Sequence, residues 1–105
     1  MQVAIKTKYV PQGEYNLECR GRYHDGSPAL QLFGDTGRLL TATVCLDHAP
    51  QPGHVMIKDW SENEGVLDAL IGAGIIGKPV SEVPTGFVKA YECPLTQAAK
   101  SALNL

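Results

Sequence analysis

The sequence predicts an α+β fold in which a mainly antiparallel sheet of five or six strands carries one principal helix at about residues 62–73. Three observations favour this class. Apolar and polar residues alternate over several short segments, turns rich in Gly and Pro separate these segments, and one stretch changes to helical spacing. The 105 residues, 44% of them hydrophobic, suffice for one core. We expect a single domain over residues 1–94, followed by a tail or short helix over 95–105.

The clearest local pattern is a β-hairpin. Two apolar segments, 29–33 and 38–46, flank Gly34-Asp35-Thr36-Gly37, a connection with two glycines. We expect residues 77–86 to form loops, because Pro79, Pro84 and Gly86 punctuate them. The other predicted strands cover residues 2–10, 15–24 (with a bulge or break at Gly21), 54–58 and 87–93.

The predicted helix has signals at both ends. Ser61 and Glu64 have the spacing of a capping box, in which the Ser oxygen accepts from a backbone amide and the Glu reaches back to the Ser amide. Gly74 suits the left-handed residue that follows a helix. Between these ends, apolar residues recur at helical spacing at Val66, Leu67, Leu70 and Ile71.

Several motifs resemble catalytic or ligand-binding signatures. Residues 72–77 match G-x-G-x-x-G, but they follow a helix rather than precede one, so helix termination explains their glycines better than a dinucleotide site. Cys45, His48 and His54 are candidate metal ligands, and the alternative is a strand-end thiol with two loop histidines. Ser61, His54 and Asp59 have the residue types of a catalytic triad, but no nucleophile motif surrounds Ser61. We therefore expect no enzyme, no cofactor and no metal site.

Composition limits the partners and the compartment. The net charge is −2, which does not suit electrostatic capture of nucleic acid. The three cysteines, Cys19, Cys45 and Cys93, are odd in number and widely spaced, so we expect free thiols. The sequence shows neither a secretory signal nor an apolar run long enough to span a membrane, and we expect a cytoplasmic protein.

Residues 58–64 form the densest polar and aromatic cluster and contain the only Trp. We interpret Asp59, Trp60, Glu62 and Asn63 as a binding patch at the helix entry, because Trp is enriched in interface hot spots. We expect Glu62 and Asn63 to lie outside core and capping positions. The alternative is structural, with Trp60 packing as a hydrophobic staple against the first helical turn.

Three segments carry a resemblance to a known family. They are Thr41-Ala42-Thr43-Val44-Cys45-Leu46, Ile57-Lys58-Asp59-Trp60-Ser61-Glu62-Asn63-Glu64-Gly65 and Val83-Pro84-Thr85-Gly86-Phe87-Val88. Together they resemble a small uncharacterised domain of bacterial plasmids, phages and integrated elements, which usually has Asn at the position of Cys45. The likeness covers about residues 29–92. It implies an accessory of mobile DNA and supplies no catalytic residues.

Two functions follow as hypotheses. In the first, the protein binds and inhibits a host protein in the bacterial cytoplasm, such as a CRISPR effector or another defence protein. In the second, it is a nucleic-acid-associated module that maintains the element, which the low net charge disfavours. A small metal-dependent or hydrolytic enzyme is a minor third reading.

Overall fold

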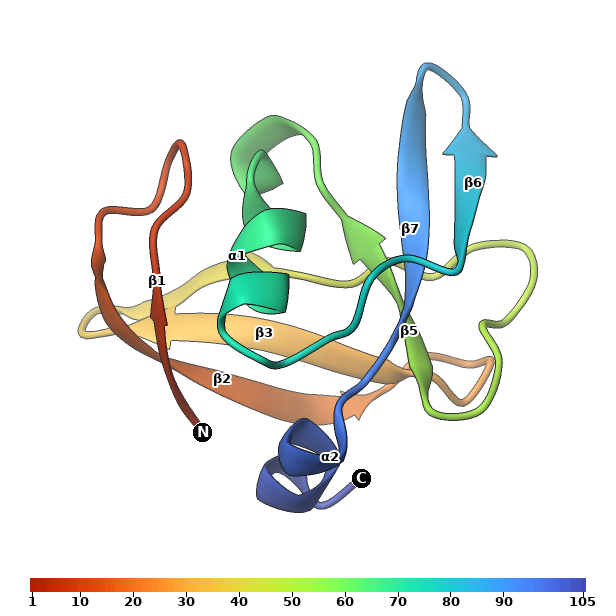
Figure 1. The fold of residues 1–105 in the computed structure, drawn as a ribbon. Coiled ribbons are helices and arrows are strands. Elements are labelled where there is room, and N and C mark those ends of the chain that lie inside the picture. The colour runs from red at the N-terminus through yellow and green to blue at the C-terminus, as the bar shows by residue number, and fades with distance from the viewer.

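Two antiparallel sheets form most of the computed structural model, which describes residues 1–105 (Figure 1). This confirms the predicted α+β class with a mainly antiparallel sheet. The first sheet has the order β1-β2-β3-β4. Its strands are β1 (Gln2–Ile5), β2 (Gly13–Arg22), β3 (Pro28–Gly34) and β4 (Gly37–Thr41).

The second sheet has the order β5-β7-β6, with β5 (His54–Lys58), β6 (Ser81–Thr85) and β7 (Val88–Pro94). The chain beyond β4 joins the two sheets. Thr43 bridges Ile57 of β5, and the amide of Lys58 donates to the carbonyl of Ala42. Residues 42–44 therefore continue the strand that was predicted over 38–46 and pair with both sheets, because the amide of Ala42 donates to the carbonyl of Leu30 in β3.

The strands number seven rather than five or six, because the sequence reasoning missed β6. Pro84 lies inside this strand, and a proline argues against a strand in a central position. β6 is the outer strand of its sheet and pairs only with β7, so the amide hydrogen that Pro84 lacks is tolerated there. The predicted hairpin is confirmed as β3 and β4, and Gly21 lies at the predicted break, where the register of β2 shifts.

The predicted single helix over 62–73 is replaced by two short elements. A 3₁₀ turn, η1, covers Ser61–Asn63, and the helix α1 covers Val66–Gly72. The capping box at Ser61 is wrong: Ser61 has a φ of 55°, which is left-handed, and no side-chain hydrogen bond caps η1. Asp59 instead caps the start of α1, because its Oδ1 accepts from the amides of Gly65 (3.1 Å) and Leu67 (2.9 Å).

The end of α1 matches the prediction. Gly74 has a φ of 76°, its amide donates to the carbonyl of Ile71, and the amide of Ile75 donates to Leu70. The predicted tail forms a second helix, α2 (Gln97–Leu103), with Thr96 as its N-cap. The Thr96 hydroxyl also donates to the carbonyl of Gly74, which ties α2 to the turn after α1.

The core lies between the first sheet, α1 and the second sheet (Figure 1). Leu17 and Leu30 from the first sheet, Ile57 from the second and Leu70 from α1 are almost fully buried in it. Ala99 of α2 belongs to the same cluster. Neither helix has the length or the apolar character that a membrane crossing needs.

Candidate functional site

The hairpin of β6 and β7 projects from the rest of the molecule (Figure 1). Thr85 pairs with Val88, so the loop between the strands has two residues, Gly86 and Phe87, which we call the hairpin tip. Gly86 has a φ of 79° and Phe87 has no positive φ, the pattern of a type II′ turn. The Phe87 side chain is fully exposed. A tight turn on paired strands therefore presents a large apolar ring to solvent.

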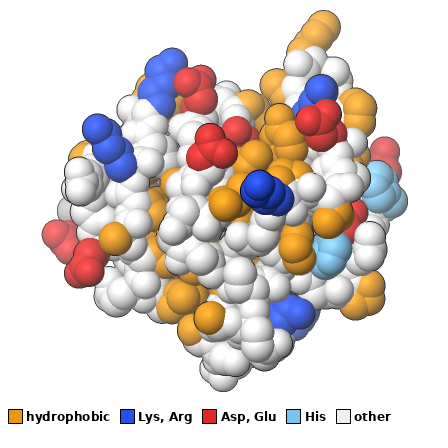
Figure 2. Space-filling model, in the orientation of Figure 1, with side chains coloured by type: hydrophobic (Ala, Val, Ile, Leu, Met, Phe, Trp, Pro, Cys, Tyr) orange, Lys and Arg blue, Asp and Glu red, His pale blue; other side chains and the backbone are white.

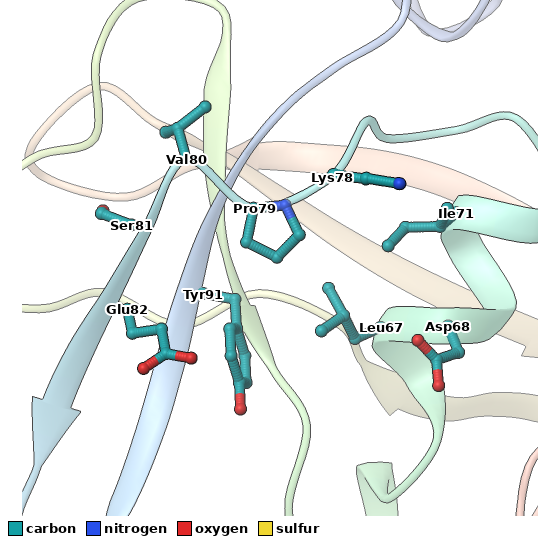
Figure 3. A pocket seen from close by; sticks show the side chains of 9 residues that line it. All are labelled: Leu67, Asp68, Ile71, Lys78, Pro79, Val80, Ser81, Glu82 and Tyr91. Carbon is teal, nitrogen blue, oxygen red and sulfur yellow. The ribbon is translucent and has the colours of Figure 1, made fainter.

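Below the tip lies an open groove of about 620 Å³ between α1 and the second sheet. Leu67 and Ile71 line it from α1, and Tyr91 lines it from β7. Figure 3 shows the Leu67 side chain coming from α1 and the Tyr91 side chain from β7, with Pro79 above the gap between them. The remaining lining residues are Asp68, Lys78, Val80, Ser81 and Glu82. The groove thus combines apolar walls with a charged rim.

One face of the hairpin is turned toward the groove, and the strand pairing determines which side chains lie on that face. Successive side chains of a strand alternate between the two faces, so Lys89 shares the face of Tyr91. Lys89 Nζ lies 3.0 Å from Glu82 Oε2, across the two strands on that face. Figure 2 shows this face, with apolar side chains at the tip of the hairpin and in the hollow between the hairpin and α1.

Two rim charges of the groove have no ion-pair partner. Asp68 on α1 and Lys78 in the segment before β6 are both exposed, and neither takes part in any of the five ion pairs of the molecule. Lys89 and Glu82 neutralise each other, and this contact raises the pKa of Lys89 above its ordinary value. The groove rim therefore offers one free charge of each sign.

The predicted binding patch over 58–64 is only partly a surface. Glu62 is exposed, and Lys58 Nζ lies 2.5 Å from its carboxylate, which lowers the pKa of Glu62. Trp60 is half-buried, and Lys58 Nζ lies 5.8 Å from the centre of its ring. Trp60 is not among the side chains packed against the core. Asp59 is half-buried and occupied by its role as the cap of α1.

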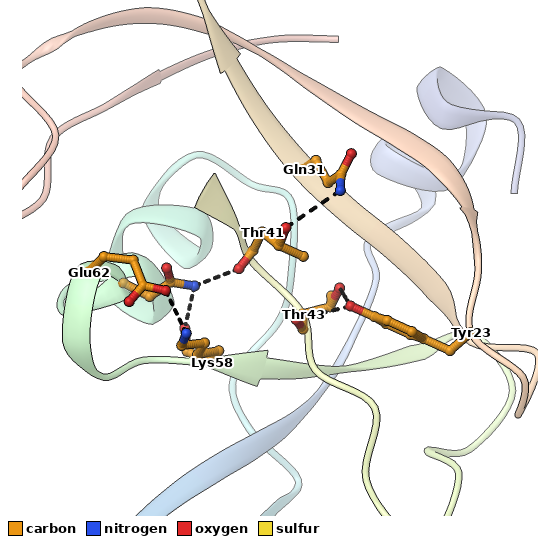
Figure 4. A network of polar contacts seen from close by, with 7 residues as sticks. Tyr23, Gln31, Thr41, Thr43, Lys58 and Glu62 are labelled. Carbon is orange, nitrogen blue, oxygen red and sulfur yellow. Dashed lines mark hydrogen bonds and ion pairs between the residues drawn. The ribbon is translucent and has the colours of Figure 1, made fainter. Parts of the chain in front are cut away.

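Asn63 corrects the expectation that it lies outside the core, because it is completely buried. Its Nδ2 donates to the carbonyls of Thr41 (2.7 Å) and Lys58 (3.2 Å). Figure 4 shows Thr41, one of the two acceptors, near the ion pair of Lys58 with Glu62. Asn63 thus connects η1 to the ends of β4 and β5. The four predicted residues are neighbours in the chain; Glu62 is exposed, Asp59 and Trp60 are each partly exposed, and only Asn63 is withdrawn from solvent.

The structure does not gather the candidate metal ligands or the candidate triad. His54 starts β5, and its Nδ1 lies 2.7 Å from the Glu92 carboxylate; Ser61 follows the other end of the same strand. Cys45 instead lies beside His24 Nδ1 (3.6 Å) and Asp25 Oδ2 (3.8 Å). Burial and the Asp25 charge raise the pKa of Cys45, which keeps it a thiol. No three such side chains are placed to hold a metal ion.

Comparison of the chain with protein-family models, with curated proteins and with solved structures finds no match.

Sequence reasoning missed the groove and the hairpin tip. A signal for the tip was available: Gly86 directly precedes the strand predicted over 87–93, and Gly at the first position of a two-residue loop is typical of a type II′ hairpin. The groove had no such signal. Its walls come from residues more than twenty positions apart, such as Leu67 and Tyr91, which only the packing of α1 against the second sheet brings together.

Proposed function

We propose that this protein is a mobile-element accessory that binds and inhibits a host protein, with a CRISPR effector or another defence protein as the expected class of target. The contact surface is the hairpin tip together with the groove below it. The cytoplasmic location follows from the same proposal, because such targets act in the bacterial cytoplasm.

The observation that carries the proposal is the complete exposure of Phe87. An exposed Phe is unfavourable in water, and burial of an aromatic side chain at an interface removes roughly 150–250 Å² from solvent. The type II′ turn and the paired strands fix the backbone that carries Phe87 before binding, so little backbone freedom is lost on association. Aromatic anchors on rigid elements are typical of interface hot spots.

The other large apolar side chains that are exposed do not form a second candidate surface. Val80 (55% exposed) belongs to the groove itself. Tyr9 (60%) and Leu39 (42%) lie elsewhere on the chain, in the loop after β1 and in β4. Phe87 is therefore the residue whose loss tests the surface, and Tyr9 provides a matched aromatic control.

The test is affinity capture from host lysate with immobilised wild type, Phe87→Ser and Tyr9→Ser, followed by an activity assay of the captured protein. We expect wild type and Tyr9→Ser to capture and inhibit the same host protein and Phe87→Ser to lose both effects. Equal capture and inhibition by Phe87→Ser would contradict the proposed surface.

A separate binding assay with DNA and RNA at physiological salt addresses the alternative class. No captured protein, combined with a mobility shift of nucleic acid, would refute inhibition of a host protein and favour a module of element maintenance. The salt concentration matters because electrostatic binding to nucleic acid weakens steeply as salt rises.

A further inference from the structure

We propose that a cavity between the end of β2, the turn before β5 and α2 binds the phosphate group of a phosphate monoester. The cavity has a volume of about 260 Å³, and Figure 1 shows α2 near the end of β2 and the start of β5. Its lining residues are Arg22, Pro28, Gly53, Leu95, Lys100 and Leu105. It shares no lining residue with the groove, so the inference does not depend on the host target.

The turn before β5 allows a lysine to lie directly against the backbone. The amide of His54 donates to the carbonyl of Gln51 (2.9 Å) and closes this turn. Pro52 and Gly53 occupy its centre, and Gly53 has a φ of 82°, the pattern of a type II turn. A Cβ at Gly53 would lie 2.9 Å from Lys100 Nζ. Glycine therefore leaves the space that the ammonium group of Lys100 occupies.

A second cation is oriented by a neighbouring turn. Arg22 ends β2, and its Nη1 donates to the carbonyl of Gly26 (2.7 Å). This bond orients the guanidinium group and uses one of its nitrogen donors. Arg22 is exposed and Lys100 is half-buried, and neither takes part in any of the five ion pairs of the molecule. Both charges are therefore available to a ligand.

The cavity contains these two positive charges and no acidic side chain. The charges of Arg22 and Lys100 repel each other, and an anion between them would replace this repulsion by two attractions. Guanidinium groups suit pairs of phosphate oxygens, and lysine binds phosphate as a point charge. A phosphate monoester carries a charge of about −1.5 to −2 at pH 7, which matches two cations. A carboxylate or a phosphodiester carries a single negative charge and matches only one of them.

Lys100 also has a possible structural role that the experiment must separate from binding. It lies in the last turn of α2, where a positive charge suits the helix dipole. On that role alone, Lys100→Gln would lower the melting temperature equally with and without phosphate. If phosphate binds to the folded chain, it should raise the melting temperature of the wild type more than that of Lys100→Gln.

The main experiment is an NMR titration of the ¹⁵N-labelled full chain with inorganic phosphate, up to about 50 mM and at constant ionic strength. We expect the amide signals of Arg22, Gly53 and Lys100 to shift together with one dissociation constant. Arg22→Gln and Lys100→Gln should each raise this constant roughly tenfold or more, as expected for a lost charge-assisted hydrogen bond. Arg38→Gln and Lys78→Gln are matched controls and should leave it unchanged, because they remove exposed, unpaired cations outside the cavity.

Other anions test the charge match. Dimethyl phosphate and acetate should bind roughly tenfold more weakly than inorganic phosphate, because each carries one negative charge. Glycerol phosphate and a phosphoserine peptide then separate the two sources of a monoester, a metabolite and a protein, and tighter binding of either one supports the proposal and identifies its source.

Circular dichroism of each variant checks that it remains folded. A wild type without saturable shifts, an Arg22→Gln or Lys100→Gln protein that binds phosphate like wild type, or equal binding of dimethyl phosphate or acetate would each overturn the proposal.

Discussion

Replacement of Asn63 should destabilise the protein although the residue was chosen from the sequence as a surface contact. In the fold it is completely buried, and its Nδ2 makes two hydrogen bonds to backbone carbonyls. Asn63→Ala removes both donors and leaves a space where the amide was. Its Oδ1 has no partner in the wild type, so the variant also removes one unsatisfied polar atom, which offsets part of the loss.

The size of the effect follows from these contacts. Two hydrogen bonds contribute about 1 kcal/mol each, and loss of the donors leaves the carbonyls of Thr41 and Lys58 without these partners. With a small cavity added, we expect a loss of about 2–4 kcal/mol. That is a large share of the roughly 5–15 kcal/mol of a domain this size.

Asn63→Asp should cost more than Asn63→Ala at neutral pH. The shape is preserved, but an oxygen replaces the donor nitrogen 2.7 Å from the carbonyl oxygen of Thr41. Burial and the two carbonyls disfavour the ionised form of the new carboxyl, so its pKa is raised in the folded state. The free energy of unfolding of Asn63→Asp should therefore be closest to that of wild type below the unfolded carboxyl pKa of about 3.9, and the difference should grow as pH rises.

Urea denaturation followed by circular dichroism measures these differences, with Trp60 fluorescence as a second probe. Glu62→Gln is the matched control, because Glu62 is exposed and its surface ion pair contributes about 0–1 kcal/mol. An Asn63→Ala variant within about 0.5 kcal/mol of wild type would refute the argument that this side chain holds η1 to the strands. The result also matters for binding experiments. If a double substitution at Glu62 and Asn63 weakened binding, unfolding of the domain and loss of a surface contact would explain the result equally well.

Four further predictions follow from single residues. Asp59→Ala should cost about 0.5–2 kcal/mol by urea denaturation through the loss of the cap of α1, while Ser61→Ala should cost less, and the reverse order would contradict the observed cap. Cys93 is fully buried, and burial raises the pKa of its thiol to about 11. Because the folded pKa is the higher one, the contribution of this thiol to stability is complete below the unfolded pKa of about 9, and roughly 2–3 kcal/mol of stability is lost as pH rises to about 11. Alkaline denaturation of Cys93→Ala should lack this loss. Phe87→Ser should leave the melting temperature within about 2 °C of wild type, because its ring contacts solvent, and a large drop would mean that the ring supports the fold. Elemental analysis should find no stoichiometric zinc, and about one zinc per chain that is lost in Cys45→Ser would disprove this.

The sequence by itself determined the elements whose signals are local. The hairpin of β3 and β4 follows from alternation around two glycines, and the strand β5 was predicted with its observed bounds. The end of α1 at Gly74 also follows from the residue types alone. In each case the interacting groups lie within a few residues of one another, so propensity and spacing suffice to predict them.

Only the tertiary structure decided the start of α1 and the role of Asn63. Asp59 and Ser61 both have capping side chains, and the choice between them depends on the direction in which the chain leaves β5. Asn63 looks like a solvent residue in its own segment, yet it is buried because η1 packs against the end of β4, and its Nδ2 reaches a carbonyl 22 positions away. The groove likewise exists only because α1 and β7 pack together. Long-range packing chooses among locally equivalent side chains, and no spacing pattern in one segment records that choice.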